Sequence, residues 1–350
     1  MGTSLGVALA AVEPPLLQGL TALPDRVKRL LAGSPVVIDG QTLDLDTQLL
    51  LRVMKVARKP VVEQIPVPEG RLALRAQSAV VGGSQPIGAV RELEVAGLPA
   101  RLYVPRGVVD DGPLLLFFHG GGFVWGDLES HDASCRYLAE QAQVRVLAVD
   151  YRLAPEHPFP AAADDAEAAL RWVTENPGAV GADPARIGVG GDSAGGNLAI
   201  VAAMAAARHG WPLKFQLLVY PAVDQTRDTR SLALFREGFF LSARFMEVAT
   251  ASYSPPGTDL RDPRLSPAFA DLAEIGERLA PAYVATAGFD PLRDEGEAFS
   301  RALAEAGIEV RLQRFPDLIH SFFNMLAAGR AARAANREIA HALRVGLHGS

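Results

Sequence analysis

The sequence of 350 residues contains a single cysteine, Cys135, and this scarcity excludes several kinds of site. One cysteine cannot form a disulfide within the chain, and it cannot supply a zinc site that is built from several thiolates. We therefore expect no disulfide framework and no multi-cysteine zinc site. A reducing compartment such as the cytoplasm fits this composition.

Long hydrophobic runs are also missing from the sequence. The longest notable apolar run covers residues 198–207, whereas a helix needs about 20 apolar residues to cross a bilayer. An apolar stretch at residues 5–12 has no Lys or Arg before it, although a signal peptide requires a basic leader. We expect neither a stable membrane anchor nor a signal peptide.

The chain carries little net charge of either sign. Its formal net charge is -6, which argues against a nucleic-acid partner because such proteins present strongly basic surfaces. Hydrophobic residues are abundant, at 49% of the sequence, whereas charged residues make up 21%. This balance is that of a globular protein with a large core.

From residue 114 onward, apolar runs of β-type residues alternate with stretches of helical character. Near-continuous apolar strands that are separated by helices indicate a parallel sheet covered on both faces. The sequence thus predicts an α/β fold with a mostly parallel central sheet and helices on both faces. A β-hairpin is predicted over 91–95 and 100–104, strands over 114–118, 144–149, 187–189, 215–220, 282–286 and 310–315, and helices over 133–142, 161–173, 194–207, 294–306 and 322–343.

Two regions depart from this alternation and are predicted to form the cap. Residues 1–85 have helical character, with a helix expected over 42–59 and a turn-rich hinge over 80–88. Residues 222–280 interrupt the α/β domain, which we expect over 86–350, and contain a helix expected over 238–253. We expect this insertion to lie above the sheet as a second cap segment.

A G-x-S-x-G pattern centred on Ser193 is the first sign of chemistry. A short strand precedes it and an alanine-rich helix follows, which is the strand–turn–helix setting that a nucleophile elbow requires. The alternative is an ordinary serine that caps a helix after a tight turn. The elbow interpretation places Ser193 at a helix N-terminus, where free N–H groups favour a developing anion.

A serine nucleophile needs a base and an acid that orients the base. His320 directly follows the last strand, and Asp290 follows the strand before it. The carboxyl ends of parallel strands are where ligand chemistry gathers in such sheets. Asp294 and Glu295 are alternative acids, although helix capping explains them as well. The predicted order Ser193, Asp290, His320 is that of an α/β-hydrolase.

Three consecutive glycines, 120–122, follow the buried strand 114–118. Acyl transfer to serine builds an oxyanion, which needs preorganised N–H donors. Bare backbone after a strand can provide them, so we expect an oxyanion hole made of Gly121, Gly122 and Ala194. The alternative is a flexible surface loop.

With these residues identified, the chain resembles the hormone-sensitive-lipase-like esterases, bacterial family IV of the α/β-hydrolases. The resemblance extends from about residue 114 to the C-terminus. It rests on "HGGGFVWG" (119–126), "DYRLAPEHPFPAA" (150–162), "GDSAGGN" (191–197), "DPLRDEG" (290–296) and "HSF" (320–322).

The resemblance implies a carboxylesterase that acts on small-molecule esters of short to medium chain length, without a cofactor, and a homodimer. It implies that Ser193, His320 and Asp290 form a catalytic triad, whereas His119 and the loop 150–162 are structural. An amidase or peptidase would use the same triad. The plant gibberellin receptor resembles this branch but lacks the histidine, and the related epoxide hydrolases and dehalogenases carry a carboxylate in place of Ser193.

Overall fold

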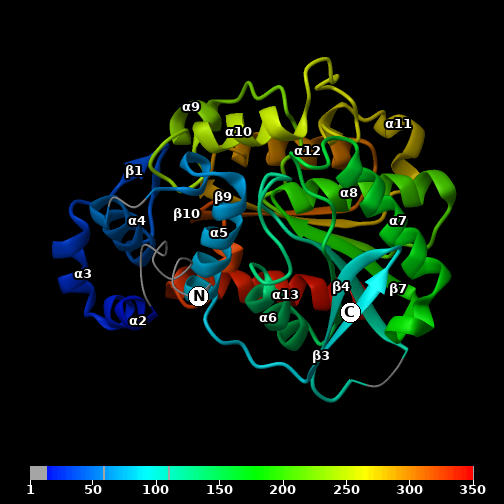
Figure 1. Ribbon diagram of the computed structural model, residues 1–350, viewed down its shortest axis with the longest axis horizontal. Helices are drawn as coiled ribbons and strands as arrows, with labels where there is room; N and C mark the ends of the chain where they lie inside the picture. The colour runs from blue at the N-terminus through cyan, green and yellow to red at the C-terminus, as the bar shows by residue number, and fades with distance from the viewer. Residues whose placement is uncertain (1–13, 58–59, 109–110, 350) are drawn as a thin grey trace.

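An eight-stranded sheet crosses the middle of the computed structural model, which describes residues 14–57, 60–108 and 111–349 (Figure 1). The strand order is β10-β9-β8-β7-β5-β6-β4-β3. All pairs from β10 to β6 are parallel, while β4 pairs antiparallel with both β6 and β3. The predicted mostly parallel sheet and the hairpin are therefore confirmed. The strands are β3 Ala89–Val95, β4 Leu98–Val104, β5 Gly112–Phe118, β6 Arg145–Val149, β7 Ala182–Asp192, β8 Phe215–Val219, β9 Ala282–Phe289 and β10 Val310–Ile319.

Helices cover both faces of this sheet, which is why its central strands are mostly apolar. Every residue of β5, β6, β8 and β9 is buried. One face packs against α7 Ala161–Glu175, α8 Ala194–His209 and α12 Arg293–Glu305, and the other against α6 Asp132–Ala142 and α13 Arg330–His348. Parallel strands buried in this way need apolar side chains on both faces.

The last predicted helix starts later than the sequence pattern indicated. The expectation of a helix from residue 322 is wrong, because Phe322–Asn324 forms only a short 3-10 turn, η5, and α13 begins at Arg330. Phe322, Phe323 and Met325 belong to the hydrophobic core between the sheet and the helices α6 and α13. Ala327 N donates to Val81 O, so tertiary contacts replace helical hydrogen bonds here.

The N-terminal region is helical as expected, with one exception. It contains α2 Pro14–Ala22, α3 Asp25–Ala32, α4 Leu45–Ala57, the 3-10 helix η1 Val62–Gln64 and α5 Val67–Gly82. The exception is a small antiparallel pair, β1 Val37–Ile38 and β2 Gln41–Thr42. The hinge expected over 80–88 starts later in the structure, because α5 continues to Gly82. Gly83, with a φ of 60°, caps the end of this helix. The apolar stretch 5–12 and Lys59 lie outside the described residues.

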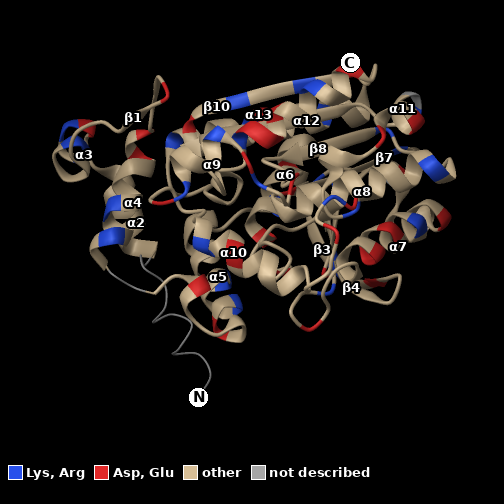
Figure 2. Cartoon of the chain, turned by 90° about the horizontal axis from the view of Figure 1, so that it is seen from above, with Lys and Arg blue, Asp and Glu red and all other residues tan. Residues whose placement is uncertain are grey.

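The insertion at 222–280 carries α9 Arg230–Phe235, α10 Ala243–Tyr253, η3 Pro267–Phe269, α11 Leu272–Ile275 and η4 Gly276–Arg278. Helix α10 begins five residues later than predicted, because the Ser242 side chain accepts a hydrogen bond from Phe245 N and caps the helix. Helices α9 and α10 are both seen at the top of Figure 1. Figure 2 shows acidic and basic residues interspersed over the helices.

The N-terminal region and the insertion meet at the loop of residues 119–126, which we call the glycine loop. The ring of Trp125 packs against Phe245 of α10, with centroids 4.5 Å apart. Gly70 of α5 lies so close to Trp125 Nε1 that a Cβ there would be 2.7 Å from it. The Ser242 hydroxyl donates to Glu63, 2.6 Å away. Within the described part of the chain, no helix is long and apolar enough to span a membrane.

Candidate active site

Ser193 occupies the sharp turn between β7 and α8. Its φ of 55° and ψ of -118° lie in a region that residues with a side chain rarely adopt. Ser193 N donates to Val219 O of the neighbouring strand, and Ser193 O accepts from Ala222 N, so the surrounding backbone holds the strained conformation. This is the elbow geometry that the G-x-S-x-G pattern predicts.

Gly191 and Gly195, which flank Ser193, must be glycine because neighbouring backbone atoms leave no room for a Cβ. A Cβ on Gly195 would lie 1.9 Å from Phe118 O, and a Cβ on Gly191 would lie 2.3 Å from the carbonyl carbon of Gly195. No side chain fits at these distances. The start of α8 therefore packs directly against the end of β5, which brings Ser193 close to the glycine loop.

His320 and Asp290 directly follow neighbouring parallel strands. Ile319, the last residue of β10, pairs with Phe289, the last residue of β9. An irregularity between Phe315 and Ile319 shifts the pairing register of β10 before this point. This shift of two residues is what places His320 beside Asp290.

The three side chains meet in a continuous chain of hydrogen bonds. His320 Nε2 lies 3.0 Å from Ser193 Oγ, and His320 Nδ1 lies 2.8 Å from Asp290 Oδ2. Asp290 is fully buried, and its other oxygen accepts from Leu292 N at 2.8 Å. This arrangement has the order and spacing that nucleophilic catalysis by serine requires.

The two alternative acids lie elsewhere. Asp294 accepts hydrogen bonds from Ser231 N and from the Arg293 guanidinium. Glu295 accepts from Val223 N and Asp224 N. Both carboxyl groups therefore bind backbone N–H groups of the insertion that follows β8. Of the three candidate acids, Asp290 is the one that hydrogen-bonds to His320.

The glycine loop lies beside Ser193. Gly121 and Gly122 have φ values of 121° and 63°, and a Cβ on Gly121 would lie 2.2 Å from Trp125 O. Gly122, Ser193 and Ala194 line one cavity. The structure thus places two of the predicted donor residues, Gly122 and Ala194, in the same cavity as the nucleophile, while Gly121 precedes Gly122 in the loop and is not among the cavity's lining residues.

A buried polar network beneath the loop was not predicted from the sequence. Asp192 Oδ1 accepts from Gly120 N at 2.8 Å and lies 3.1 Å from His131 Nε2. Burial raises the pKa of Asp192, but His131 and the Gly120 N–H outweigh it and lower the pKa overall. The network ties the residue before the nucleophile to the glycine loop. The only sequence signal was the position of Asp192 inside the G-x-S-x-G pattern.

His119 and the loop 150–162 make structural contacts. The Tyr151 hydroxyl donates to His119 O at 2.7 Å, and the two rings stack with centroids 4.3 Å apart. Burial and the neighbouring His131 lower the pKa of His119 to about 4. Arg152 forms a bidentate pair with Asp165 of α7. These contacts fix the glycine loop against the sheet.

Glu295 is a buried carboxyl group behind the site. Burial raises its pKa to about 8 in spite of the two backbone N–H groups that it accepts from. The group therefore holds a proton at neutral pH. The unfolded chain, with the ordinary pKa of 4.5, releases that proton.

We expect Glu295→Gln to raise the free energy of unfolding at pH 8 by about 1–3 kcal/mol, with little change at pH 5. Between pH 4.5 and about 8 the folded chain binds more protons than the unfolded chain, so stability falls as the pH rises. Glutamine has no proton to lose, and its oxygen can still accept from the backbone. Urea unfolding at both pH values measures the difference.

The matched control is Glu297→Gln on the same helix, which removes an ion pair with Arg314. It should give no gain in stability at pH 8. If Glu295→Gln were no more stable than the parent at pH 8, the raised pKa would be contradicted.

The cavity at Ser193 is small and mostly apolar. Its volume is about 30 Å³, room for about two water molecules. Phe123, Leu241, Phe245, Met246 and Leu292 form most of the apolar wall. Among the described residues there is no cluster of three or more His, Cys, Asp or Glu side chains that could hold a metal ion.

Comparison with known proteins agrees with this geometry. The family model described as alpha/beta hydrolase fold matches residues 115–324, more than half of the chain. The carboxylic ester hydrolase LipN of Mycobacterium tuberculosis is 44% identical over 93% of this chain and 89% of its own length. An ethyl acetate hydrolase of Pseudomonas putida is 42% identical over 65% of this chain and 72% of its own.

A solved structure shows the same relationship. An ester hydrolase from the metagenome of Lake Arreo, complexed with a derivative of bipyridine phosphonate, superposes with a TM-score of 0.82 at 40% identity, covering 87% of this chain and 98% of that one. The family model and the relatives together establish the family. The chain belongs to the α/β-hydrolase fold family, in its hormone-sensitive-lipase-like branch of esterases.

Proposed function

We propose that this chain is a carboxylesterase that hydrolyses short- to medium-chain esters through an acyl-enzyme on Ser193. The observation that carries the proposal is the hydrogen-bonded chain from Ser193 Oγ through His320 to the buried Asp290, at a strained elbow. The relatives named as ester hydrolases support the same reaction class.

In the acylation half, Ser193 Oγ attacks the ester carbonyl carbon while His320 Nε2 takes the hydroxyl proton. Asp290 accepts the hydrogen bond from Nδ1–H, which holds the imidazole in the reactive tautomer and stabilises its cation. The N–H groups of Gly121, Gly122 and Ala194 stabilise the oxyanion. The bond from carbon to the alcohol oxygen then breaks, and the alcohol leaves with the proton from His320.

In the deacylation half, water attacks the acyl-enzyme as His320 takes its proton. The bond to Ser193 Oγ breaks, the serine recovers the proton and the carboxylic acid leaves. Each step moves protons between groups of the chain, substrate and water, and the sequence of steps uses no cofactor.

We further propose that the N-terminal helices and the insertion at 222–280 form a cap that limits substrate size. The contact of Trp125 with Phe245 and the hydrogen bond from Ser242 to Glu63 support a joint covering over the glycine loop. A homodimer and a cytoplasmic location stay predictions.

An acyl-chain series tests the substrate class. We expect kcat/KM for 4-nitrophenyl esters to be highest between acetate and hexanoate, and to fall at least tenfold at dodecanoate, because the cavity at Ser193 is small and a longer acyl chain has to displace more of its apolar wall. Met246 lies between this cavity and a second one of about 390 Å³. Met246→Ala should therefore move the optimum to longer chains.

Val248→Ala is the control, since Val248 is on the same helix and packs into the core instead. It should leave the chain-length profile unchanged. A parent profile that rises steadily to dodecanoate would contradict the assigned substrate class.

A further inference from the structure

Arg227 of the insertion lies in the wall between the two cavities, and it borders both of them. Its Nη1 donates to Met246 O at 3.0 Å and to Thr250 Oγ1 at 2.7 Å, and its Nη2 donates to Gln225 Oε1 at 2.5 Å. Its Nε is buried and has no hydrogen-bond partner in the described part of the chain. All the acceptors are neutral groups.

Arg227 differs from Arg293 and Arg101 because it forms no ion pair with a carboxylate of the described residues. Arg293 is 3% exposed and pairs with Asp39 and Asp294. Arg101 pairs with three carboxylates. For Arg227 the described residues include no ion-pair partner, and the nearby Glu295 and Asp224 act on its charge only without direct contact. Burying a cation without a counter-ion is costly.

The acidic groups around Arg227 do not neutralise it by contact. Glu295 is bound to backbone N–H groups and holds a proton at neutral pH, and Asp224 accepts from Thr226. On the outer cavity, Glu247 pairs with Arg244, while Asp228 and Arg236 also border that cavity. Burial lowers the pKa of Arg227. Its φ of 53° adds backbone strain, which folded chains retain at functional positions more than elsewhere.

We propose that Arg227 is a specificity residue that binds a carboxylate carried by the ester substrate, an inference that rests on the proposed esterase function. Nε and Nη2 form the side-on edge of the guanidinium, which matches two carboxylate oxygens. Nε is already unpartnered, and the Gln225 amide is the one group to be displaced from Nη2. Arg227 lines the same cavity as Ser193, so one substrate molecule can reach both.

The carboxylate can belong to the acyl part or to the alcohol part of the ester, and paired substrates separate the two. Monomethyl succinate against methyl 4-methylpentanoate tests the acyl side. Acetoxyacetate against isobutyl acetate tests the alcohol side. In each pair an isopropyl group replaces the carboxylate at similar size, so the kcat/KM ratio within a pair isolates the charge.

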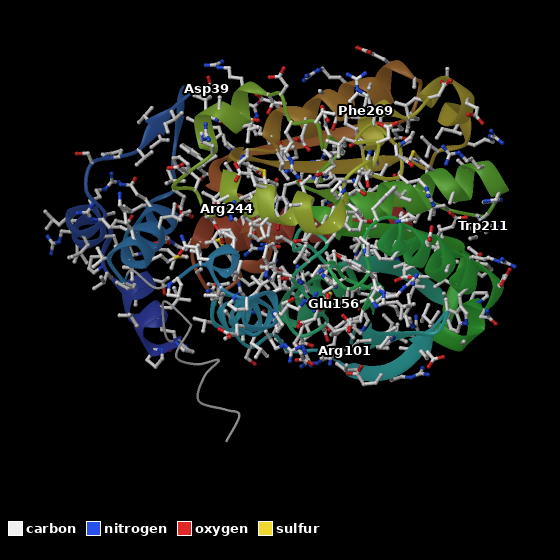
Figure 3. All side chains as sticks on the ribbon, turned by 45° about the horizontal axis from the view of Figure 1, so that its top comes forward. Asp39, Arg101, Glu156, Trp211, Arg244 and Phe269 are labelled. Atoms are coloured by element: carbon white, nitrogen blue, oxygen red, sulfur yellow. The ribbon has the colours of Figure 1, made fainter. Side chains whose placement is uncertain are left out.

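We expect one carboxylate ester to be preferred to its isostere by the parent enzyme, and Arg227→Met to lower that ratio by roughly 10- to 100-fold. Arg227→Lys, which keeps the charge but loses the fork, should give an intermediate ratio. The control is Arg244→Met, which removes the same charge from the outside of α10, where Figure 3 labels Arg244; its ratio should equal that of the parent. Circular dichroism and turnover of the isosteres report folding.

A parent that prefers the isostere in both pairs, or an Arg227→Met variant with an unchanged ratio, would overturn the proposal. Binding is read separately by calorimetric titration of the two carboxylate esters into Ser193→Ala protein with and without Arg227→Met. Binding that depends on Arg227 without any turnover by the parent would refute the esterase function and support carboxylate recognition. Turnover of the isosteres without binding that depends on Arg227 would support the esterase function and refute carboxylate recognition by Arg227.

Discussion

Ser193→Ala should reduce kcat for 4-nitrophenyl acetate by about 10⁵- to 10⁶-fold, to the level that binding and oxyanion stabilisation alone provide. The hydroxyl is the atom that His320 Nε2 contacts at 3.0 Å, and alanine leaves the histidine without a proton to take. The fold should survive, because the backbone bonds of residue 193 to Val219 and Ala222 do not involve its side chain. Stopped-flow and long-time assays of the purified variant measure the loss.

The matched control is Ser300→Ala, a buried serine in α12 whose hydroxyl donates to Gly296 O of its own helix. It should retain parental kcat. A phosphonate that labels the parent and Ser300→Ala should not label Ser193→Ala. Retention of more than 1% of the activity, or labelling of the variant, would remove Ser193 from the mechanism.

The layout of the sheet could be predicted because each central strand is apolar on both faces. The run at 114–118 and its counterparts at 144–149 and 282–286 read as strands with helices between them, and the structure confirms them. The start of α13 could not be predicted in the same way. Residues 322–326 have helical composition, but their buried side chains and the bond from Ala327 N to Val81 O decide the local backbone.

The site was predictable only as far as strand ends locate it. Ser193, Asp290 and His320 each follow a strand, and the carboxyl ends of parallel strands share one edge of the sheet. The register shift in β10 that brings His320 level with Asp290 depends on pairing across 30 residues, which no local pattern encodes. The contact between Asp192 and His131 likewise joins segments that only the fold brings together. The same is true of the surroundings of Arg227, which has no ion-pair partner among the described residues.

Asp290→Asn should lower kcat by about 10³- to 10⁴-fold while leaving KM nearly unchanged. Asp290 Oδ1 accepts from Leu292 N, and an asparagine oxygen can keep that bond. The amide nitrogen then faces His320 Nδ1 and donates to it. This forces the proton onto Nε2, which would point at Ser193 and could no longer accept the serine proton. Steady-state kinetics with 4-nitrophenyl butyrate measures the effect.

Asp294→Asn provides the comparison that makes this prediction specific to the tautomer. The change in charge is the same and lies four residues away, but Asp294 binds Ser231 N and Arg293 rather than the histidine. It should alter kcat less than tenfold and act mainly on stability. Equal losses in both variants would mean that negative charge near the strand ends matters and that the oriented hydrogen bond to His320 does not. A loss confined to Asp290→Asn would assign the effect to that hydrogen bond, since both variants remove one negative charge near the strand ends.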